Sequence, residues 1–353
     1  MDSLTQALLG ASVQGALLGR WQGRKALLYG AALGTLPDLD VLIDYGDAVA
    51  NMTAHRGFSH SLAVLSGFAL LLTAALRRWR PHPGYGGVRL LATIWLVLVT
   101  HVLLDAFTSY GTQLWWPLAT TPPVAWSSVF IIDPLYSLPL LAAVGLALVT
   151  GLAGRRARGL WVALLLSSLY LGSTLAGKQM AERRVGAELA ARGQSTERLF
   201  SAPTPFNSLL WRVVALDGEH YHEAVVGWFD RAPPAVVTLP RGAHLAAHLQ
   251  ANPAHARLLG FTDGFLRYDR LGDALVVTDL RLGMTGYHPF RFPLAHHQDG
   301  RWLAAEHPQR LPTRRPEPER LQQLWARLWH SSPPLPLAQW ADGLGAAQDA
   351  VRH

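Results

Sequence analysis

The sequence predicts a mainly α fold: a polytopic membrane helical bundle of four to six membrane helices, followed by a C-terminal α+β soluble domain. Half of the 353 residues are apolar and only 16% are charged, a balance typical of membrane proteins. The long apolar segments lie before residue 177, whereas most charges and eleven of the fifteen histidines lie after it. We therefore expect a membrane-embedded helical domain over residues 1–176 and a second domain over residues 177–353.

Four apolar segments are long enough, or nearly so, to cross the ~30 Å hydrocarbon layer at ~1.5 Å per helical residue. They cover residues 60–76, 88–109, 135–152 and 159–176. Two earlier segments, 4–19 and 26–43, are shorter or richer in glycine. We expect these two to be spans or half-buried helices.

The distribution of positive charge predicts the orientation. Basic residues crowd alternate connections between the apolar segments: Arg20, Arg24 and Lys25; Arg77, Arg78, Arg80 and Arg89; and Arg155, Arg156 and Arg158. The other connections hold only Arg56. By the positive-inside rule the basic connections are cytoplasmic. The remaining loops, including the Trp- and Pro-rich loop 110–134, and the domain after Gly177 are then extracytoplasmic.

The second domain shows the signals of mixed secondary structure. A Glu-, Arg- and Ala-rich helix is expected to about Gly193. Two strands, Leu209–Leu216 and Tyr221–Phe229, are joined across Asp217-Gly218, a good hairpin signal. We also expect a strand over Ala274–Leu280 and a helix over Glu317–Leu328.

Composition excludes several functions. The chain has no cysteine, which excludes disulfides, thiolate metal sites and a Cys nucleophile, so any metal must bind to nitrogen and oxygen ligands. The formal net charge is +7, and the densest basic runs, at residues 77–80 and 155–158, lie directly beside apolar segments. We interpret these runs as juxtamembrane anchors in the lipid bilayer and expect no nucleic-acid partner. No motif indicates a Ser-triad hydrolase, nucleotidase or dehydrogenase.

Ionisable residues are costly inside apolar segments, so those present are functional candidates. The predicted topology brings six of them to the same membrane face: Asp38, Asp40, His55, His60, His101 and Asp105. Imidazole and carboxylate together suit a divalent ion, with zinc preferred and manganese or magnesium as alternatives. A loop-to-helix break must separate the paired histidines if both are to face the ion. We predict a metal site built from these six residues.

Three residues of this region are candidates for catalytic roles. Asp40 and Asp105 can combine metal ligation with general-base chemistry, and Arg56 can bind the anionic part of a substrate. We expect Ser59 to cap the following helix, whose N-terminus would favour an anion. A metal ion with these anion-binding groups suits a phosphate ester as substrate.

Each feature also has a structural interpretation. The Leu-Pro-Asp-Leu-Asp run at residues 36–40 can be a helix stop with a turn. His101 and Asp105 can form an intramembrane hydrogen bond, and Arg56 can be an ordinary interfacial residue. In the second domain, His244 and His248 fit a solvated helix face, and Asp279 with Arg281 a surface pair.

Four ordered motifs resemble the YdjM-like family of membrane-bound proteins regarded as metal-dependent hydrolases. They are Met1-Asp2-Ser3-Leu4-Thr5-Gln6, Leu36-Pro37-Asp38-Leu39-Asp40, the run His55 to Ser61, and His101-Val102-Leu103-Leu104-Asp105. The resemblance covers about residues 1–150. It implies a prokaryotic inner-membrane location and hydrolase chemistry. Many relatives carry His where this chain has Gln6, so a ligand role at that position is not carried over.

Three functions remain open at this point. The first is a membrane-bound metal-dependent hydrolase acting on a lipid or lipid-linked phosphoester at the outer membrane interface. The second is a non-enzymatic membrane scaffold or regulator that binds a protein partner through its C-terminal domain. The third, a transporter, predicts polar residues in the middle of several spans, whereas here they gather toward one end.

Overall fold

A computed structural model describes residues 1–118, 122–313 and 317–346, without the side chains of Arg155, Arg156 and residues 342–346. The side chains of these two arginines, which belong to a predicted basic run, and residues 119–121 of the predicted outward loop lie outside the described part of the chain. The chain forms two compact units. The first holds residues 1–43, 55–175 and 205–207, and the second holds residues 44–54, 176–204 and 208–353.

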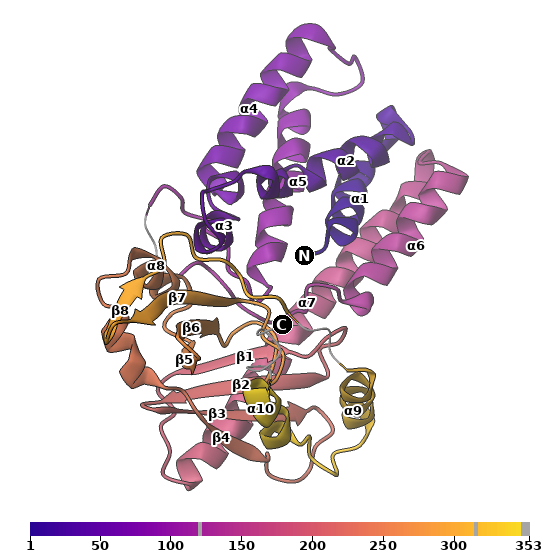
Figure 1. Ribbon diagram of the computed structural model, residues 1–353. Helices are drawn as coiled ribbons and strands as arrows, with labels where there is room; N and C mark the ends of the chain where they lie inside the picture. Colours follow the sequence, from indigo (N-terminus) through magenta and orange to yellow (C-terminus); the bar gives the residue numbers. More distant parts are fainter. Residues whose placement is uncertain (119–121, 314–316, 347–353) are drawn as a thin grey trace. The chain divides into compact units, whose positions relative to one another are not determined.

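The first unit is built from helices (Figure 1). Its α-helices are α1 (Ser3–Gln22), α2 (Lys25–Thr35), α4 (Leu62–Trp79), α5 (Gly87–Ala106), α6 (Pro134–Thr150) and the start of α7 (Arg158–Ala191). Three short 3-10 helices connect them: η1 (Pro37–Leu42), η2 (Phe58–His60) and η3 (Gly154–Ala157).

Three of the described helices, α4, α5 and α7, are long and apolar enough to cross a membrane. The predicted segments 60–76, 88–109 and 159–176 coincide with them. Helix α6 matches the predicted segment 135–152 but has only 17 residues. The segment 26–43 is not one helix, since α2 ends at Thr35 and η1 follows from Pro37. Proline has no backbone N–H, so Pro37 cannot donate the hydrogen bond that would continue the α-helix.

Helices α1 and α2 pack backbone to backbone through glycine. A Cβ atom added to Gly10 would lie 2.2 Å from the Gly30 carbonyl oxygen and 2.9 Å from the Gly34 Cα. Only residues without a side chain allow such an approach, as at small-residue interfaces between membrane helices. Twelve of the twenty residues of α1 are buried, so α1 lies inside the unit and can present Gln6 to α5.

Helices α4 and α5 share a core of Leu65, Ala69, Ile94, Leu98 and Val102. Helix α4 begins at Leu62 because the Ser61 hydroxyl accepts a hydrogen bond from the Val64 amide. The prediction that Ser59 caps this helix is therefore wrong.

The second unit contains two four-stranded antiparallel sheets with strand orders β1-β2-β3-β4 and β5-β6-β7-β8. The strands are β1 (Leu199–Pro203), β2 (Leu210–Asp217), β3 (His220–Gly227), β4 (Val236–Pro240), β5 (Leu266–Leu271), β6 (Ala274–Asp279), β7 (Arg291–Gln298) and β8 (Arg301–Ala304). Its helices are α3 (Ala48–Ala54), η4 (Ala243–Leu249), α8 (Pro253–Phe261), α9 (Pro318–Trp329), α10 (Leu337–Ala346) and the end of α7.

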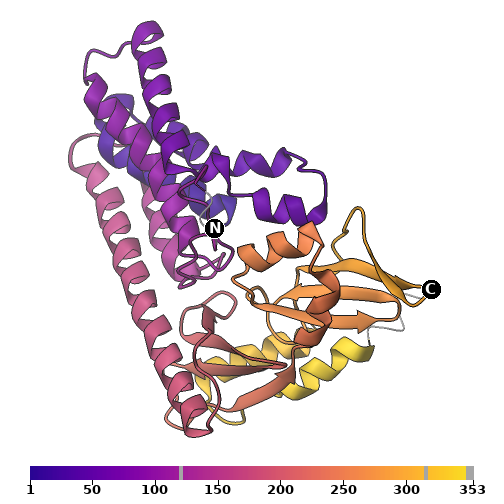
Figure 2. The same ribbon diagram turned by 90° about the vertical axis from the view of Figure 1, so that its left-hand side faces the viewer.

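The predicted hairpin is confirmed, with Asp217 paired to His220 and Gly218 at φ +54° in the turn. The predicted strand 274–280 corresponds to β6 and the predicted helix 317–328 to α9. The expected helix to about Gly193 is the end of α7, which continues through residue 177 without a break (Figure 2).

The interior of the second unit contains buried ion pairs. Arg212 donates to Glu223 at 2.8 Å, and both side chains are buried. Asp279 and Arg281 are also buried and form a two-point ion pair. The expectation that they form a surface pair is therefore wrong, because Asp279 ends an interior strand of its sheet. His244 is exposed and pairs with Glu219.

Candidate metal centre

Four side chains of the first unit converge on one point. They are Asp38 from η1, His60 from η2, and His101 and Asp105, one turn apart on α5. Each offers one ligand atom, and the four atoms lie within 4.8 Å of one another. His60, His101 and Asp105 are fully buried, and the side chain of Asp38 is 18% exposed. This group can hold a metal ion.

The distances between the ligand atoms provide a test of fit. His60 Nε2 lies 3.4 Å from Asp38 Oδ1, 3.1 Å from Asp105 Oδ2 and 3.3 Å from His101 Nε2. His101 Nε2 lies 3.5 Å from Asp38 Oδ1 and 3.4 Å from Asp105 Oδ2. A tetrahedron with metal–ligand bonds of about 2.05 Å has edges of about 3.3 Å. Five of the six distances between the four ligand atoms are close to this value. The donor set, two imidazole nitrogens and two carboxylate oxygens, is of the kind that zinc accepts.

The outer partners of the two histidines orient both Nε2 lone pairs toward this point. His101 Nδ1 lies 2.6 Å from the Gly34 carbonyl oxygen, which can only accept, so Nδ1 carries the proton. His60 Nδ1 lies 2.9 Å from the Ser59 hydroxyl, which itself donates to Asp40. Such anchoring of the second ring nitrogen is the usual arrangement around metal-binding histidines.

The two oxygens of Asp105 have different surroundings. Oδ1 accepts from the Gln6 amide at 3.0 Å, pairs with Arg56 at 3.2 Å and contacts the Met1 amino group. Oδ2 faces the two imidazoles. The donors on Oδ1 hold the carboxylate in one rotamer and leave Oδ2 as the ligand atom.

Asp40 and His55 stand beside the group of four rather than in it. Asp40 Oδ1 lies 2.9 Å from His55 Nδ1, and its Oδ2 accepts from the Arg56 amide at 2.9 Å and from the Ser59 hydroxyl at 2.7 Å. Both oxygens of Asp40 thus bind the segment that carries His60. The required break between the histidines is present, since α3 ends at Ala54 and η2 follows.

Arg56 occupies a strained backbone conformation with φ +62°, uncommon for a residue with a Cβ. Its side chain is buried, and its guanidinium reaches Asp105 and donates to the Thr108 hydroxyl at 3.1 Å. Sequence reasoning did not single out Thr108. The signal was available, because Thr108 follows Asp105 by three residues and so shares its side of the chain.

Apolar side chains are exposed on the helix that carries Asp38. Leu39, Val41 and Leu42 of η1 are 54%, 70% and 80% exposed. Asp38 is the member of the group open to the surroundings, so access to the group is bordered by apolar surface.

A helical unit with candidate spans and a buried Asp/His group defines a polytopic membrane protein with a candidate metal centre. The family described as "YdjM inner membrane protein" matches residues 1–181. The chain therefore belongs to the YdjM inner membrane protein family.

Two relatives extend this comparison. The uncharacterized protein YfhP of Bacillus subtilis (strain 168) is 24% identical over 311 residues, which are 82% of this chain and 89% of that protein. The inner membrane protein YbcI of Escherichia coli (strain K12) is 37% identical over 93 residues, 26% of this chain and 52% of that protein. No solved structure shows a significant match.

Proposed function

We propose that this protein is a membrane-bound metal-dependent hydrolase that acts on a lipid or lipid-linked phosphoester at the outer membrane interface. The observation that carries the proposal is the convergence of two imidazoles and two carboxylates, from Asp38, His60, His101 and Asp105, with ligand atoms within 4.8 Å of one another. Two imidazoles among the ligands favour zinc over magnesium, which prefers six oxygen ligands.

A bound divalent ion would lower the pKa of a bound water to near 7 and polarise a phosphoryl oxygen. The surrounding residues supply the rest. Gln6 and Arg56 fix Asp105 through its outer oxygen, and Asp40 and Ser59 fix His60. Asp38, the least buried member, would lie nearest to an entering substrate and could accept a proton from an attacking water. Arg56 would reach a substrate anion only by opening its pair with Asp105.

The exposed apolar residues of η1 support a lipid-like substrate. Leu39, Val41 and Leu42 flank the two aspartates of this helix in sequence and are exposed. Because apolar side chains gain free energy on leaving water, they favour a position against acyl chains. The charge pattern of the loops supports an extracytoplasmic position for this end of the first unit.

A second candidate, a scaffold or regulator that binds a partner through its C-terminal domain, is favoured by one observation. Structural zinc sites have four protein ligands, whereas catalytic sites keep a position open for water. The group here already offers four. The hydrolase proposal therefore requires either that water replace Asp38 as a metal ligand or that the metal accept water as a fifth ligand.

Hydrolysis by the purified full-length protein separates the two candidates. We would compare a phospholipid and a water-soluble phosphodiester in mixed micelles, with zinc and with a chelator. The hydrolase proposal predicts metal-dependent cleavage of the lipid that is reduced at least about 100-fold in Asp38→Asn. His244→Ala, an exposed histidine of the second unit, is the matched control and should keep full activity.

Two results would contradict the hydrolase proposal. One is cleavage that survives Asp38→Asn and metal removal, which would indicate a contaminating enzyme. The other is a stoichiometric metal that Asp38→Asn leaves in place, with no cleavage by either protein, which would favour the structural role.

A further inference from the structure

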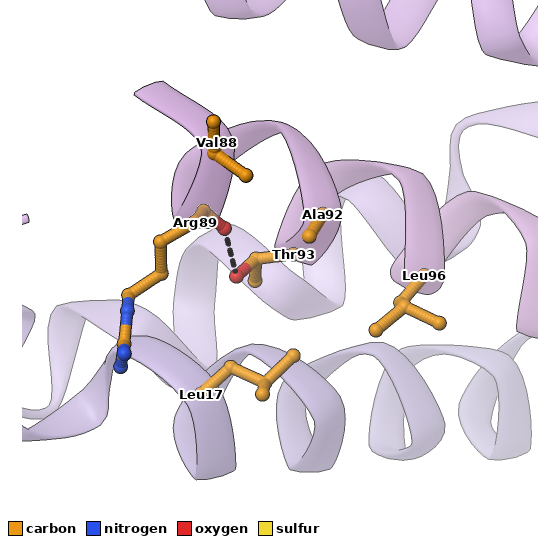
Figure 3. Close-up of a pocket in the computed structure, with 6 residues that line it drawn as sticks. All are labelled: Leu17, Val88, Arg89, Ala92, Thr93 and Leu96. Carbon is orange, nitrogen blue, oxygen red and sulfur yellow. Dashed lines mark hydrogen bonds between the residues drawn. The ribbon is translucent and has the colours of Figure 1, made fainter. Parts of the chain in front are cut away.

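A groove on the first unit lies away from the metal centre, between α1 and α5. It encloses about 470 Å³ and is lined by Leu17, Val88, Arg89, Ala92, Thr93 and Leu96 (Figure 3). The Thr93 hydroxyl donates to the Arg89 carbonyl oxygen at 2.8 Å, so its hydrogen-bonding proton is already used. The Arg89 guanidinium is therefore the one strongly polar group of the lining. It extends at one end of the groove, and Leu96 lies at the other (Figure 3).

Further cations gather at the Arg89 end. The Arg89 and Arg20 guanidinium carbons lie 4.7 Å and 4.3 Å from the centre of the same Trp21 ring. Arg77 lies against the first residue of α5, since a Cβ on Gly87 would be 2.7 Å from its Cδ. Cation–π contacts with one indole therefore gather two positive charges no more than about 9 Å apart at this end of the groove.

No carboxylate among the described residues is paired with these arginines. The sequence segments 1–43 and 55–175 contain five carboxylates, namely Asp2, Asp38, Asp40, Asp105 and Asp133. Three of them belong to the metal centre or brace it, Asp2 caps α1, and Asp133 caps α6 and accepts from Tyr170. The charge at this end of the groove is therefore without a counter-ion in the described part of the chain.

We propose that this groove binds an acidic phospholipid, with an acyl chain along Leu17, Ala92 and Leu96 and the phosphate at the Arg89 end, where Arg20 adds a second positive charge. Helix α5 is a candidate span, so its outer face meets lipid. Basic pockets between membrane helices are recognised sites for anionic headgroups. The apolar lining selects a lipid rather than a free anion, because inorganic phosphate would gain nothing from it. This inference does not depend on the proposed function.

Native mass spectrometry of the detergent-purified full-length protein, titrated with phosphatidylglycerol or phosphatidylcholine, tests this site. We expect phosphatidylglycerol to bind more tightly, and Arg89→Gln to weaken its binding by about fivefold. Arg89→Lys should restore part of the loss. Arg78→Gln removes an exposed charge from the end of α4 and should change binding less than twofold. Ala92→Phe keeps every charge but fills the groove, and should weaken binding of the long-chain lipid.

Three outcomes would overturn the proposal. Equal binding of phosphatidylglycerol and phosphatidylcholine would show that the negative charge of the headgroup does not contribute to binding. Equal losses in Arg89→Gln and Arg78→Gln would indicate diffuse attraction by basic loops. Displacement of the lipid by an equal concentration of inorganic phosphate would assign the arginines to a free anion. If Arg89→Gln fails to fold, the binding of lipid to Ala92→Phe and the competition with phosphate still test whether a lipid occupies the groove.

Discussion

Arg56 combines an unfavourable backbone conformation with a buried guanidinium that Asp105 needs. A side chain at positive φ costs roughly 1–2 kcal/mol, and Asp40 offsets this cost by accepting the Arg56 amide. Strain held in place by the surrounding structure is common at functional sites. The segment 55–60 is thus built to put His60 and Arg56 on either side of one carboxylate, Asp105.

The two contributions of Arg56 can be separated by a pair of variants. Arg56→Ala and Arg56→Gly both leave Asp105 Oδ1 without its guanidinium and should lose about 3–5 kcal/mol of stability. Only glycine relieves the strain, so we expect Arg56→Gly to be about 1 kcal/mol more stable than Arg56→Ala. Thermal unfolding in one detergent ranks the three proteins. An alanine variant at least as stable as the glycine variant would contradict the assigned backbone conformation.

His288 makes the stability of the second unit depend on pH. Burial and the nearby Arg212 and Arg267 lower its pKa from 6.5 to about 3. Between about pH 6.5 and pH 3, His288 is protonated in the unfolded chain and neutral in the folded protein. Stability is therefore complete above about pH 6.5 and falls as the pH drops, by up to about 1.4 kcal/mol per unit.

Hydrogen exchange of β6 and β7 in the full-length protein, measured from pH 7 to about pH 5 and corrected for intrinsic exchange rates, reports this loss. His288→Gln removes the titrating ring and should flatten the dependence. His244→Gln, at an exposed position, should leave it unchanged. An equally steep dependence in His288→Gln would assign the effect to another group.

The site residues that could be predicted from the sequence are ionisable residues in or beside apolar segments. Asp38, His60, His101 and Asp105 stood out because ionisable groups are costly beside or within apolar segments. Ser59 was misassigned because a serine before a helix suggests a cap, and only the fold shows that the helix begins after Ser61 and that the Ser59 hydroxyl donates to Asp40. The burial of Asp279 and Arg281 likewise depends on the packing around the β6 end, which no local pattern records.

At the scale of elements, the glycine contact between α1 and α2 sets the position of Gln6 and of the Gly34 carbonyl that anchors His101. Gly30→Ala would place a methyl group 2.2 Å from the Gly10 carbonyl oxygen. Because backbone cannot yield as a flexible side chain does, we expect a loss of about 3 kcal/mol or more.

Gly67→Ala in α4 is the matched control. A Cβ there meets nothing within 4 Å, so alanine should be neutral or stabilising by up to about 1 kcal/mol through helix propensity. Thermal unfolding in detergent compares the two variants. Equal stability of Gly30→Ala and the parent protein would show that the helices do not touch at this position.

Long apolar helices were predictable from composition, and strands were predictable only in part. Helices α4 and α5 follow from runs of apolar residues. The hairpin of β2 and β3 follows from Asp217-Gly218. Strands β1 and β8 are short edge strands of five and four residues, and strand formation there depends on pairing with a neighbour.

At the scale of the whole molecule, the charge pattern predicts that the C-terminal domain lies outside the cytoplasm. The chain has no cysteine, so single cysteines can report the side of the membrane. We expect a membrane-impermeant maleimide to label His244→Cys in spheroplasts and to label Arg78→Cys only after lysis. Both positions are exposed. The opposite pattern would reverse the orientation and place the candidate metal centre at the cytoplasmic face.

The metal content of the purified protein shows whether Asp38, His60, His101 and Asp105 hold an ion. Inductively coupled plasma mass spectrometry of the detergent-purified protein should find about one zinc per chain. His60→Ala and Asp105→Ala, which each remove one ligand atom, should lose it. His82→Ala removes an exposed histidine that stacks on Tyr85 and should retain it. Two results would contradict a metal centre at these residues. One is a parent protein without stoichiometric metal after growth with zinc, manganese and magnesium. The other is an equal metal content in all four proteins.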